Sequence, residues 1–476
     1  MVFLKKSTAF AFSPLLRSML TLLPELVLVF GILLLFILDL FASKKHYRTL
    51  TYISALVPIA SLISLLFVNY PSKTLFDLFE VNSLNLLGKA VIYLLTSLAL
   101  FSMQDYYEKK NSVYTELSYL LLMPTLGLSL LLSSNNLVLL FLSLELASIS
   151  MYVLVSLQKG EYFSKEAGFK YLVIGAVGTS MLALGSAFYY ASTGSLFFKE
   201  YRDENSLFLL ALFLILSALA LKASAVPYHF WTPDAYEGAP TPITGYLSSV
   251  PKVTIYFFLV KLLSYFYHLK QWLILVALLS LLSMFYANFV AYTQRSVKRL
   301  LAYSTIAHAG YFFLGLATAQ PNLQKALLFY VSLYAFASLG SFTLMASLEK
   351  REGFSHHILD YRGLFKDHPA LASIFALFLF AFIGIPPMAL FVGKLGLFMG
   401  LVNSMLFPLA LAFVIASIIS AGYYLRVIVS MFLEEGEKKY PPAKVSGGEA
   451  LTLMVCSLFM LLLGIFPHLF YDLIKF

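Results

Sequence analysis

Long apolar runs follow one another along the whole chain, separated by short polar stretches. Each run is about 20 residues long, the length that an α-helix needs to cross a hydrocarbon layer of about 30 Å. We therefore predict an all-α polytopic membrane protein with about fourteen transmembrane helices, since a helix satisfies its own backbone polar groups in lipid. The predicted spans are 20–41, 50–69, 82–102, 115–133, 136–157, 167–191, 206–224, 236–264, 272–292, 299–318, 323–347, 370–401, 406–432 and 449–472.

The polar stretches between the spans are too short for a soluble domain, and the longest of them lies near 347–369. The sequence therefore predicts a single integral membrane domain over 1–476. Its expected parts are N-terminal helices at 20–110, a first five-helix repeat at 115–265, a second at 270–432 and a C-terminal helix at 449–472.

Two spans are interrupted by proline. One interruption begins at Lys222 and contains four prolines up to Pro242, and the other is G-I-P-P from Gly384 to Pro387. Each proline removes a backbone donor, so a broken helix survives in a membrane only where protein or water satisfies the freed groups. In transporters such breaks occur in pairs, one in each of two related repeats. In this chain the two breaks fall in the seventh and twelfth spans, five spans apart. A repeat with an odd number of crossings is inverted relative to its partner. We therefore predict two inverted five-helix repeats with discontinuous helices 7 and 12.

Composition agrees with a protein whose solvent is the bilayer. Hydrophobic residues make up 60% of the chain and charged residues only 12%, against about a quarter in a soluble domain. The net charge of +9 comes from Lys and Arg in short loops, which predicts membrane orientation rather than nucleic-acid binding. Cys456 is the only cysteine, which excludes an internal disulfide and a cysteine-ligated metal or iron–sulfur site.

The basic loops also predict the sidedness of the chain. Loops that follow odd-numbered spans hold about twice as many Lys and Arg residues as the others, so both termini are expected on the non-cytoplasmic side. Lys5, Lys6 and Arg17 oppose this assignment. A short apolar stretch near them lacks a small-residue cleavage site, so no removable signal peptide is expected.

Four ionisable residues lie where a charged side chain costs about 2.5 to 3.5 kcal/mol. They are Glu145, Lys222 and Lys394, and Lys252 after a proline. Burial favours a neutral lysine and a nearby carboxylate favours a charged one, by similar amounts, so such a pair is the smallest unit that transfers protons electrostatically. The alternative for each is a side chain that snorkels to the interface.

Other polar residues in the spans are weaker candidates for a role in proton transfer. His229 and His308 titrate near neutrality and are candidates for proton relay between the lysines, with satisfied core histidines as the alternative. Lys89, Lys261 and Arg426 lie nearer to span ends, and we expect them to snorkel to the interface.

Three motifs carry a resemblance to a known family. They are K-A-S-A-V-P-Y-H-F-W-T-P-D-A-Y-E-G-A-P-T-P at 222–242, Q-R-S-V-K-R-L-L-A-Y-S-T-I-A-H-A-G-Y at 294–311, and L-S-L-E-L-A-S-I-S-M-Y around Glu145. The chain resembles, from about residue 20 to 470, the proton-conducting subunits of complex I and of multisubunit cation/proton antiporters. The absence of further C-terminal helices, L-L-P-E at 22–25 and the lysine in F-V-G-K-L resemble the N type of subunit more than the L and M types.

The resemblance implies a role for each buried charge. Glu145 and Lys222 would form a modulating pair, Lys252 an intermediate proton carrier, and Lys394 the terminal lysine toward the opposite compartment. The two histidines would be neighbours on the water-lined path.

The resemblance also implies a setting. The chain would be a cofactor-free, proton-translocating subunit of an NADH:quinone oxidoreductase of the cell inner membrane, with NADH, FMN, iron–sulfur clusters and quinone bound in other chains. Its partners would be the M-type antiporter-like subunit, the small K-type subunit and lipids, and no nucleic acid. Alternatives are a sodium/proton antiporter complex, a membrane-bound hydrogenase-type complex, and a purely structural subunit.

Overall fold

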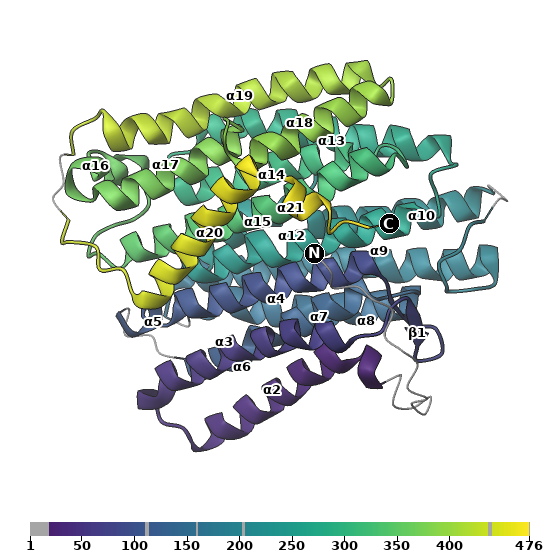
Figure 1. Cartoon of the computed structure of the whole chain (residues 1–476), viewed down its shortest axis with the longest axis horizontal. Helices are drawn as coiled ribbons and strands as arrows, with labels where there is room; N and C mark the ends of the chain where they lie inside the picture. Colours follow the sequence, from purple (N-terminus) through teal and green to yellow (C-terminus); the bar gives the residue numbers. More distant parts are fainter. Residues whose placement is uncertain (1–18, 110–113, 159, 202–204, 437–439, 476) are drawn as a thin grey trace.

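The computed structural model describes residues 19–109, 114–158, 160–201, 205–436 and 440–475. Lys5, Lys6, Arg17 and the stretch considered for a signal peptide lie outside these residues. The described chain is a bundle of helices (Figure 1). Its helices are α2 (Leu23–Phe41), η1 (Lys44–His46), α3 (Tyr47–Ser64), η2 (Leu65–Phe67), α4 (Ser83–Met103), α5 (Tyr106–Lys109), α6 (Leu117–Leu120), α7 (Leu122–Leu132), α8 (Leu137–Val155), α9 (Tyr162–Thr193), α10 (Ser206–Ala223), α11 (Trp231–Gly238), α12 (Thr241–Leu263), α13 (Lys270–Thr293), α14 (Val297–Leu314), α15 (Pro321–Glu349), η3 (Ile358–Tyr361), α16 (Leu364–Asp367), α17 (Pro369–Ile383), α18 (Ala389–Asn403), α19 (Phe407–Phe432), α20 (Gly447–Ile465) and α21 (His468–Tyr471).

The helices begin where the sequence supplies a cap or a proline. Asn82, Asn136, Asn205 and Ser296 each accept a hydrogen bond from a backbone N–H of the first turn that follows. Proline occupies the first turn of α2, α12, α15, α17 and α19, where its missing N–H costs nothing. These local signals determine where the helices begin, and the length of each apolar run determines how far the helix extends.

Among the described residues, eleven helices are long and apolar enough to cross a membrane, and shorter apolar helices occupy 117–132, 369–383 and 389–403. Every predicted span coincides with one helix or with two consecutive ones. The all-α polytopic class is therefore confirmed.

The most buried helices are α12 and α15, in which 94% and 100% of the most apolar segment is covered by other helices. They lie in the middle of the bundle, while α2 and α19 form its two edges (Figure 1). Large apolar side chains of the edge helices, such as Phe30 and Ile418, are exposed. A helix with such a face needs lipid or another subunit against it.

The predicted helix breaks are present. In the first, α10 ends at Ala223, Ser224 adopts a left-handed conformation with φ 68°, and the short helix α11 follows before α12. In the second, α17 ends at Ile383, Gly384 has φ 86°, and α18 begins five residues further on, at Ala389. The freed backbone groups at both breaks face protein, as described below.

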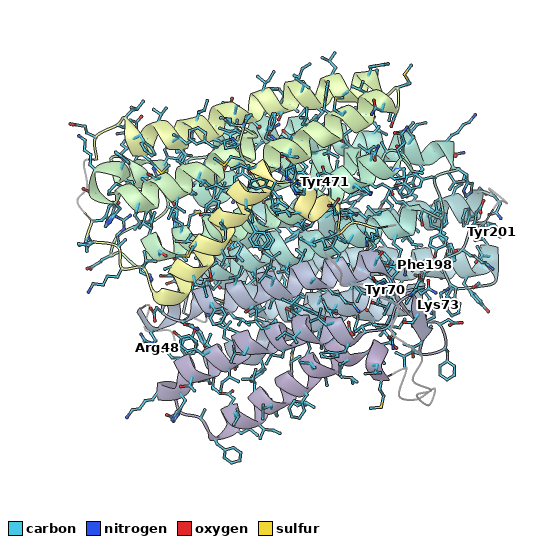
Figure 2. All side chains as sticks on the ribbon, viewed as in Figure 1. Arg48, Tyr70, Lys73, Phe198, Tyr201 and Tyr471 are labelled. Carbon is cyan, nitrogen blue, oxygen red and sulfur yellow. The ribbon has the colours of Figure 1, made fainter. Side chains whose placement is uncertain are left out.

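A two-stranded antiparallel hairpin of β1 (Ser72–Thr74) and β2 (Phe79–Val81) precedes α4 and was not predicted. The hydroxyl of Ser83, two residues after the hairpin, donates to the carbonyl of Lys475 at 2.6 Å, so the hairpin and the segment around Lys475 share one end of the bundle. Lys73 of the hairpin lies at this end and Arg48 at the other (Figure 2). We call these the hairpin end and the opposite end.

Candidate functional site

Lys252 caps the broken end of α10. Its Nζ donates to the Ala223 carbonyl at 3.0 Å and to Ser224 Oγ at 2.5 Å. The last carbonyls of a helix lack partners within the helix and form the negative end of its dipole, so they attract a cation. The indole of Trp231 closes the same end, because its Nε1 donates to the Leu221 carbonyl at 2.9 Å and its ring lies 5.5 Å from the lysine nitrogen.

Lys222 extends from the last turn of α10 toward α8. Its Nζ donates to Ser148 Oγ at 2.8 Å and to the Tyr152 hydroxyl at 3.2 Å. Glu145 lies one turn before Ser148 on α8, and its Oε1 accepts from Thr179 of α9 at 2.6 Å. The structure therefore brings the predicted glutamate and lysine to the same part of α8, but each side chain bonds to hydroxyl groups.

A cavity of about 20 Å³ lies between Lys222 and Lys252 and is also lined by Ser148 and Tyr171. It is large enough for one water molecule, and although most of its lining is apolar, Ser148 and the two lysines offer that water polar partners. The two lysines are thus joined by a space in which a proton can be carried by water.

His308 lies at the centre of the second half of the bundle, fully enclosed by α14, α15, α17 and α19 side chains. Its Nδ1 lies 2.8 Å from the Tyr330 hydroxyl and its Nε2 lies 3.2 Å from the Tyr424 hydroxyl. Tyr424 also forms a short hydrogen bond with Ser304. Both ring nitrogens therefore have a partner that can donate or accept a proton.

Hydroxyl groups of three helices lie between Lys252 and this histidine. Ser338 of α15 donates to Ser248 of α12 at 2.7 Å, and Tyr334 of α15 donates to Thr305 of α14 at 2.8 Å. Ser248 is one turn from the lysine on α12, and Thr305 is one turn from the histidine on α14. The two predicted halves of the site are thus linked by polar groups in the most buried part of the bundle.

Lys394 repeats the arrangement of Lys252 at the second break. Its Nζ donates to the carbonyls of Phe382 and Ile383, at 2.9 and 3.0 Å, and to Ser417 Oγ at 2.8 Å. These carbonyls are the end of α17. Gly384 allows the close approach, because a Cβ there would lie 2.9 Å from Cδ of the lysine.

We name the residues of this region the central polar axis: Glu145, Lys222, Lys252, His308 and Lys394. Its three lysines are buried. Within the described residues, none of them forms an ion pair with a carboxylate, and their partners are hydroxyls and carbonyls. An ammonium held only by neutral groups in a low-dielectric interior loses its proton more readily than one locked to a carboxylate.

His229 is placed apart from the axis. Its ring contacts Phe230 and Tyr286, with ring centres 4.6 and 4.8 Å away. Its Nδ1 is buried and has no hydrogen-bond partner among the described residues. The structure therefore gathers five of the six predicted site residues into one region and leaves this histidine against α13, next to the first break.

An ion network joins the two longest motifs. Arg299, from the motif at 294–311, contacts Asp234 at 2.9 Å and Glu237 at 2.8 Å, both in the motif at 222–242. Lys170 of α9 pairs with the same aspartate at 3.0 Å. The carboxyl pKa of Asp234 is lowered despite its burial, because both cations donate hydrogen bonds to it. These charges fix α11 to α9 and α14.

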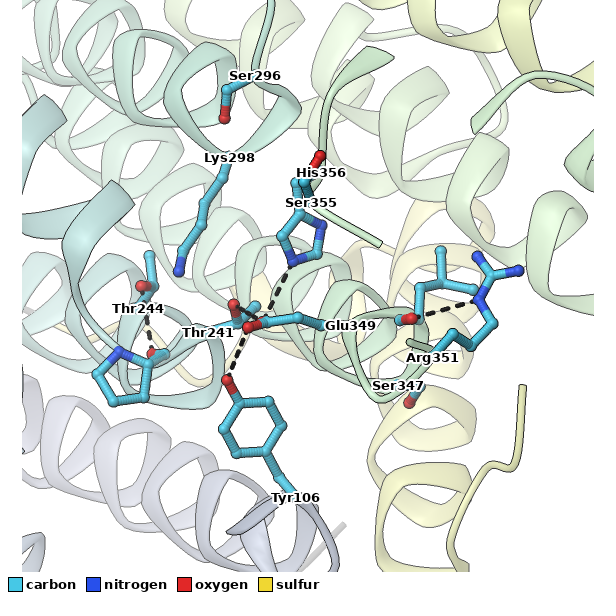
Figure 3. Close-up of polar contacts among 12 residues, drawn as sticks. Tyr106, Thr241, Thr244, Ser296, Lys298, Ser347, Glu349, Arg351, Ser355 and His356 are labelled. Carbon is cyan, nitrogen blue, oxygen red and sulfur yellow. Dashed lines mark hydrogen bonds and ion pairs between the residues drawn. The ribbon is translucent and has the colours of Figure 1, made fainter. Parts of the chain in front are cut away.

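Sequence reasoning missed a polar cluster at the opposite end of the bundle. Glu349, the last residue of α15, accepts from Tyr106 at 3.0 Å, contacts Nε2 of His356 at 3.2 Å and forms a short hydrogen bond with Thr241 (Figure 3). Thr241 is the first residue of α12, so the cluster lies where the most buried helices reach the surface. The contributing residues come from three segments that are distant in the sequence, around 106, 241 and 349–356, which no local pattern reveals.

The prediction that Lys89 and Lys261 snorkel to the interface was wrong. Lys89 Nζ lies 2.7 Å from Oε1 of Glu25, and the two side chains are only 1% and 5% exposed. Lys261 pairs with Glu80 of the hairpin at 3.1 Å. A carboxylate from a distant segment meets each lysine inside the protein. Arg426, in contrast, is exposed and donates to the carbonyl of Tyr292, in the last turn of α13, at 2.8 Å.

The chemistry available is proton transfer. Within the described ranges no three His, Cys, Asp or Glu side chains lie close enough together to hold a metal ion. The axis offers lysines, a histidine, a carboxylate and hydroxyl groups, with hydrogen bonds at each of these residues and a water-sized cavity beside Lys222 and Lys252.

Comparison with known proteins places this geometry in one group. The family described as "NADH:quinone oxidoreductase/Mrp antiporter, TM" matches residues 134–420. NADH-quinone oxidoreductase subunit N 1 of Aquifex aeolicus is 56% identical over 95% of this chain and 98% of its own length. Subunit N 2 of a Hydrogenobaculum species is 42% identical over 95% of this chain and 97% of its own length.

Solved structures share the fold. A chain of respiratory complex I from Thermus thermophilus, solved with bound aureothin, has a TM-score of 0.82 and 27% identity over 94% of this chain and 98% of that chain. A chain of the Mrp complex from a Dietzia species has a TM-score of 0.85 at 20% identity, over 96% of both chains, which is a likeness of fold.

Proposed function

This chain belongs to the subunit N family of NADH-quinone oxidoreductases, and from that premise we propose that protons cross it along the central polar axis. It is an antiporter-like, proton-translocating, multi-pass membrane subunit of respiratory complex I, and its partners are other subunits of that complex. The redox energy is released in those other subunits. The work of this chain is to bind, hold and release protons.

The observation that carries the path is the position of Lys252 and Lys394. Each ammonium rests on the carbonyl end of a broken helix, and each is buried. A fixed helix end stabilises the charged form, while burial opposes it. The balance between these effects is sensitive to any neighbouring charge, so a change at one lysine alters proton binding at the next.

The roles follow the order of the residues along the axis. Glu145 and Lys222 form the modulating pair at one end, Lys252 is the intermediate carrier, and Lys394 is the terminal lysine. His308 relays between Lys252 and Lys394 through its two tyrosine partners. His229 lies against α13 beside the first break and is a neighbour of the path rather than a link in it.

The two breaks support an inverted repeat. α10 and α17 approach the middle of the bundle from opposite ends of the molecule (Figure 1), and each ends at an unwound segment whose carbonyls bind a lysine. We therefore assign repeats to 115–265 and 270–432 and count the short helix pair α17 and α18 as one interrupted crossing, which gives the about fourteen crossings expected from the apolar runs.

The same proposal covers the setting of the chain. It lies in the cell inner membrane, with both termini on the non-cytoplasmic side and with the M-type and K-type subunits on its flanks. The exposed apolar faces of α2, α9, α13 and α19 are available for those contacts and for lipid. NADH, FMN, iron–sulfur clusters and quinone belong to other chains.

The proposal is tested with the whole complex reconstituted in vesicles. Glu145→Gln and Lys222→Ala each remove one member of the modulating pair and are expected to lower NADH-driven proton uptake at least fivefold while the complex still assembles. The control is Lys366→Ala, a surface lysine 66% exposed, which should leave uptake unchanged. Normal uptake in both pair variants would contradict the path.

A further inference from the structure

A second buried carboxylate–lysine pair lies outside the central polar axis. Glu25 of α2 and Lys89 of α4 are in contact at 2.7 Å and are almost completely buried. Ser129 of α7 donates to Oε1 of the same carboxylate at 2.5 Å, and the Tyr93 hydroxyl lies 2.6 Å from that serine. The pair thus sits in a polar pocket made by three of the N-terminal helices.

The second carboxylate oxygen, Oε2 of Glu25, is buried and has no hydrogen-bond partner among the described residues. An unpaired buried acceptor on a charged group is expensive. The cost falls when the carboxyl group gains a proton and becomes neutral, or when a water molecule donates to the oxygen. A buried ion pair also gives little net stability compared with apolar residues of similar size. Helix packing alone therefore does not account for two charges at this position.

One side of the pair leads to the hairpin end of the bundle. The ammonium of Lys89 lies 4.6 Å from the ring centre of Phe79 in β2. The next residue, Glu80, is 20% exposed and pairs with Lys261 of α12, which is 8% exposed. The exposed fraction of these charged side chains thus rises from 1% at Lys89 to 8% at Lys261 and 20% at Glu80.

The other side leads toward the opposite end. Thr96 lies one turn after Tyr93 on α4, and Thr125 lies one turn before Ser129 on α7. The two threonine hydroxyls are 3.2 Å apart, and that of Thr125 is 2.9 Å from the hydroxyl of Tyr246 in α12. The rise of one turn is about 5.4 Å, a distance that one or two water molecules bridge. Tyr246 is on the same helix as Thr241, which bonds to Glu349 at the opposite end (Figure 3).

We propose that Glu25 and Lys89 form a second proton-binding pair, which exchanges protons with the hairpin end through Glu80 and Lys261. This goes beyond the central polar axis, since none of its residues takes part. In the transfer step one proton moves from Nζ of Lys89 to a carboxylate oxygen of Glu25. An N–H bond breaks, an O–H bond forms, and the ion pair becomes a neutral amine and carboxylic acid with no change in net charge.

The decisive variant is Lys89→Arg. Arginine keeps the positive charge and the ion pair with Glu25, but it does not release a proton at any pH that proteins withstand. In the complete complex reconstituted in vesicles, we expect Lys89→Arg to assemble in normal amount and to lower NADH-driven proton uptake at least twofold. Proton uptake equal to that of the wild type would overturn the proposal, because a structural ion pair tolerates arginine.

Lys350→Arg is the matched control. Lys350 forms another buried pair with Glu449, at 2.5 Å, between two helix ends, and its arginine variant should pump normally. Equal losses in both arginine variants would also overturn the proposal, since the effect would then be general to buried lysines.

Glu25→Gln is the second variant, and it tests the proposal if the larger arginine side chain does not fit beside α2 and Lys89→Arg fails to assemble. Glutamine still accepts the hydrogen bond from Ser129 but carries no proton, so the same twofold loss is expected. Failure of both variants to assemble would assign the pair to packing and end the proposal. Normal pumping in Lys222→Ala, combined with a loss in Lys89→Arg, would contradict the central polar axis and leave the second pair standing.

Discussion

Five buried lysines of the described residues are held by two kinds of partner. Lys89, Lys261 and Lys350 meet carboxylates, whereas Lys252 and Lys394 meet the carbonyl ends of broken helices. A full negative charge attracts an ammonium more strongly than the partial charge of a helix end. The lysines on helix ends are therefore the ones whose protonation responds most easily to a charge that arrives nearby.

The tyrosine partners of His308 allow a test at a single hydroxyl group. Tyr424→Phe removes the hydroxyl that contacts both Ser304 and Nε2 of the histidine, with little change in volume. We expect a three- to tenfold lower rate of proton uptake in vesicles, because the relay loses one partner, and normal assembly of the complex.

Tyr423→Phe is the control for this variant. Tyr423 is the residue before Tyr424, and its hydroxyl donates to Asn288 at 3.1 Å. The Tyr423→Phe variant therefore measures the effect of losing a buried hydroxyl that does not contact His308. Equal rates in the two variants would show that the hydroxyl of Tyr424 has no part in the relay.

At the scale of elements, α20 holds the second break in place. A Cβ at Gly464 would lie 1.8 Å from the carbonyl oxygen of Pro387, so the helix touches the unwound backbone directly. Gly464→Ala should displace this segment, at an overpacking cost of about 1 to 3 kcal/mol. The expected result is a lower melting temperature of the complex and reduced proton uptake.

Gly447→Ala, at the start of the same helix, is the control, because no heavy atom lies within 4 Å of its Cβ position. A melting temperature that is equal in the two alanine variants would contradict the role of α20 as a support of the break.

The sequence predicted the elements better than their contacts. Apolar runs of span length located the helices, and the prolines at 227–242 and 386–387 located the breaks, because both signals are local. The hairpin was missed because its strands have three residues each. The ion pairs of Lys89 and Lys261 were missed because Glu25 lies 64 positions before one lysine and Glu80 lies 181 positions before the other. Only the fold brings these charges together.

At the scale of the whole molecule, the two ends of the bundle have different neighbours in the cell. Lys73 lies at the hairpin end and Arg48 at the opposite end (Figure 2). Lys45 is three residues before Arg48 in the chain, and the side chains of Lys45 and Lys73 are both exposed. The positive-loop pattern assigns the end with Lys45 to the cytoplasm. We therefore propose that the end with Lys45 faces the cytoplasm and that the hairpin end faces the other side of the membrane.

Cysteine labelling tests this orientation. The single native thiol, Cys456, is buried, so a membrane-impermeant maleimide should react only with an introduced cysteine. In intact cells Lys73→Cys is expected to be labelled and Lys45→Cys to be protected. In inverted membrane vesicles the pattern should be reversed. Labelling of Lys45→Cys in intact cells would show that the chain has the opposite orientation.

The central claim is that lysines on the ends of broken helices release and rebind protons during turnover. The most direct test is the rate of NADH-driven proton uptake by reconstituted complex carrying Lys252→Arg, measured together with assembly. Arginine preserves the charge on the end of α10 but keeps its proton. Uptake reduced at least fivefold in a fully assembled complex is the predicted result, and uptake at the wild-type rate would contradict the claim.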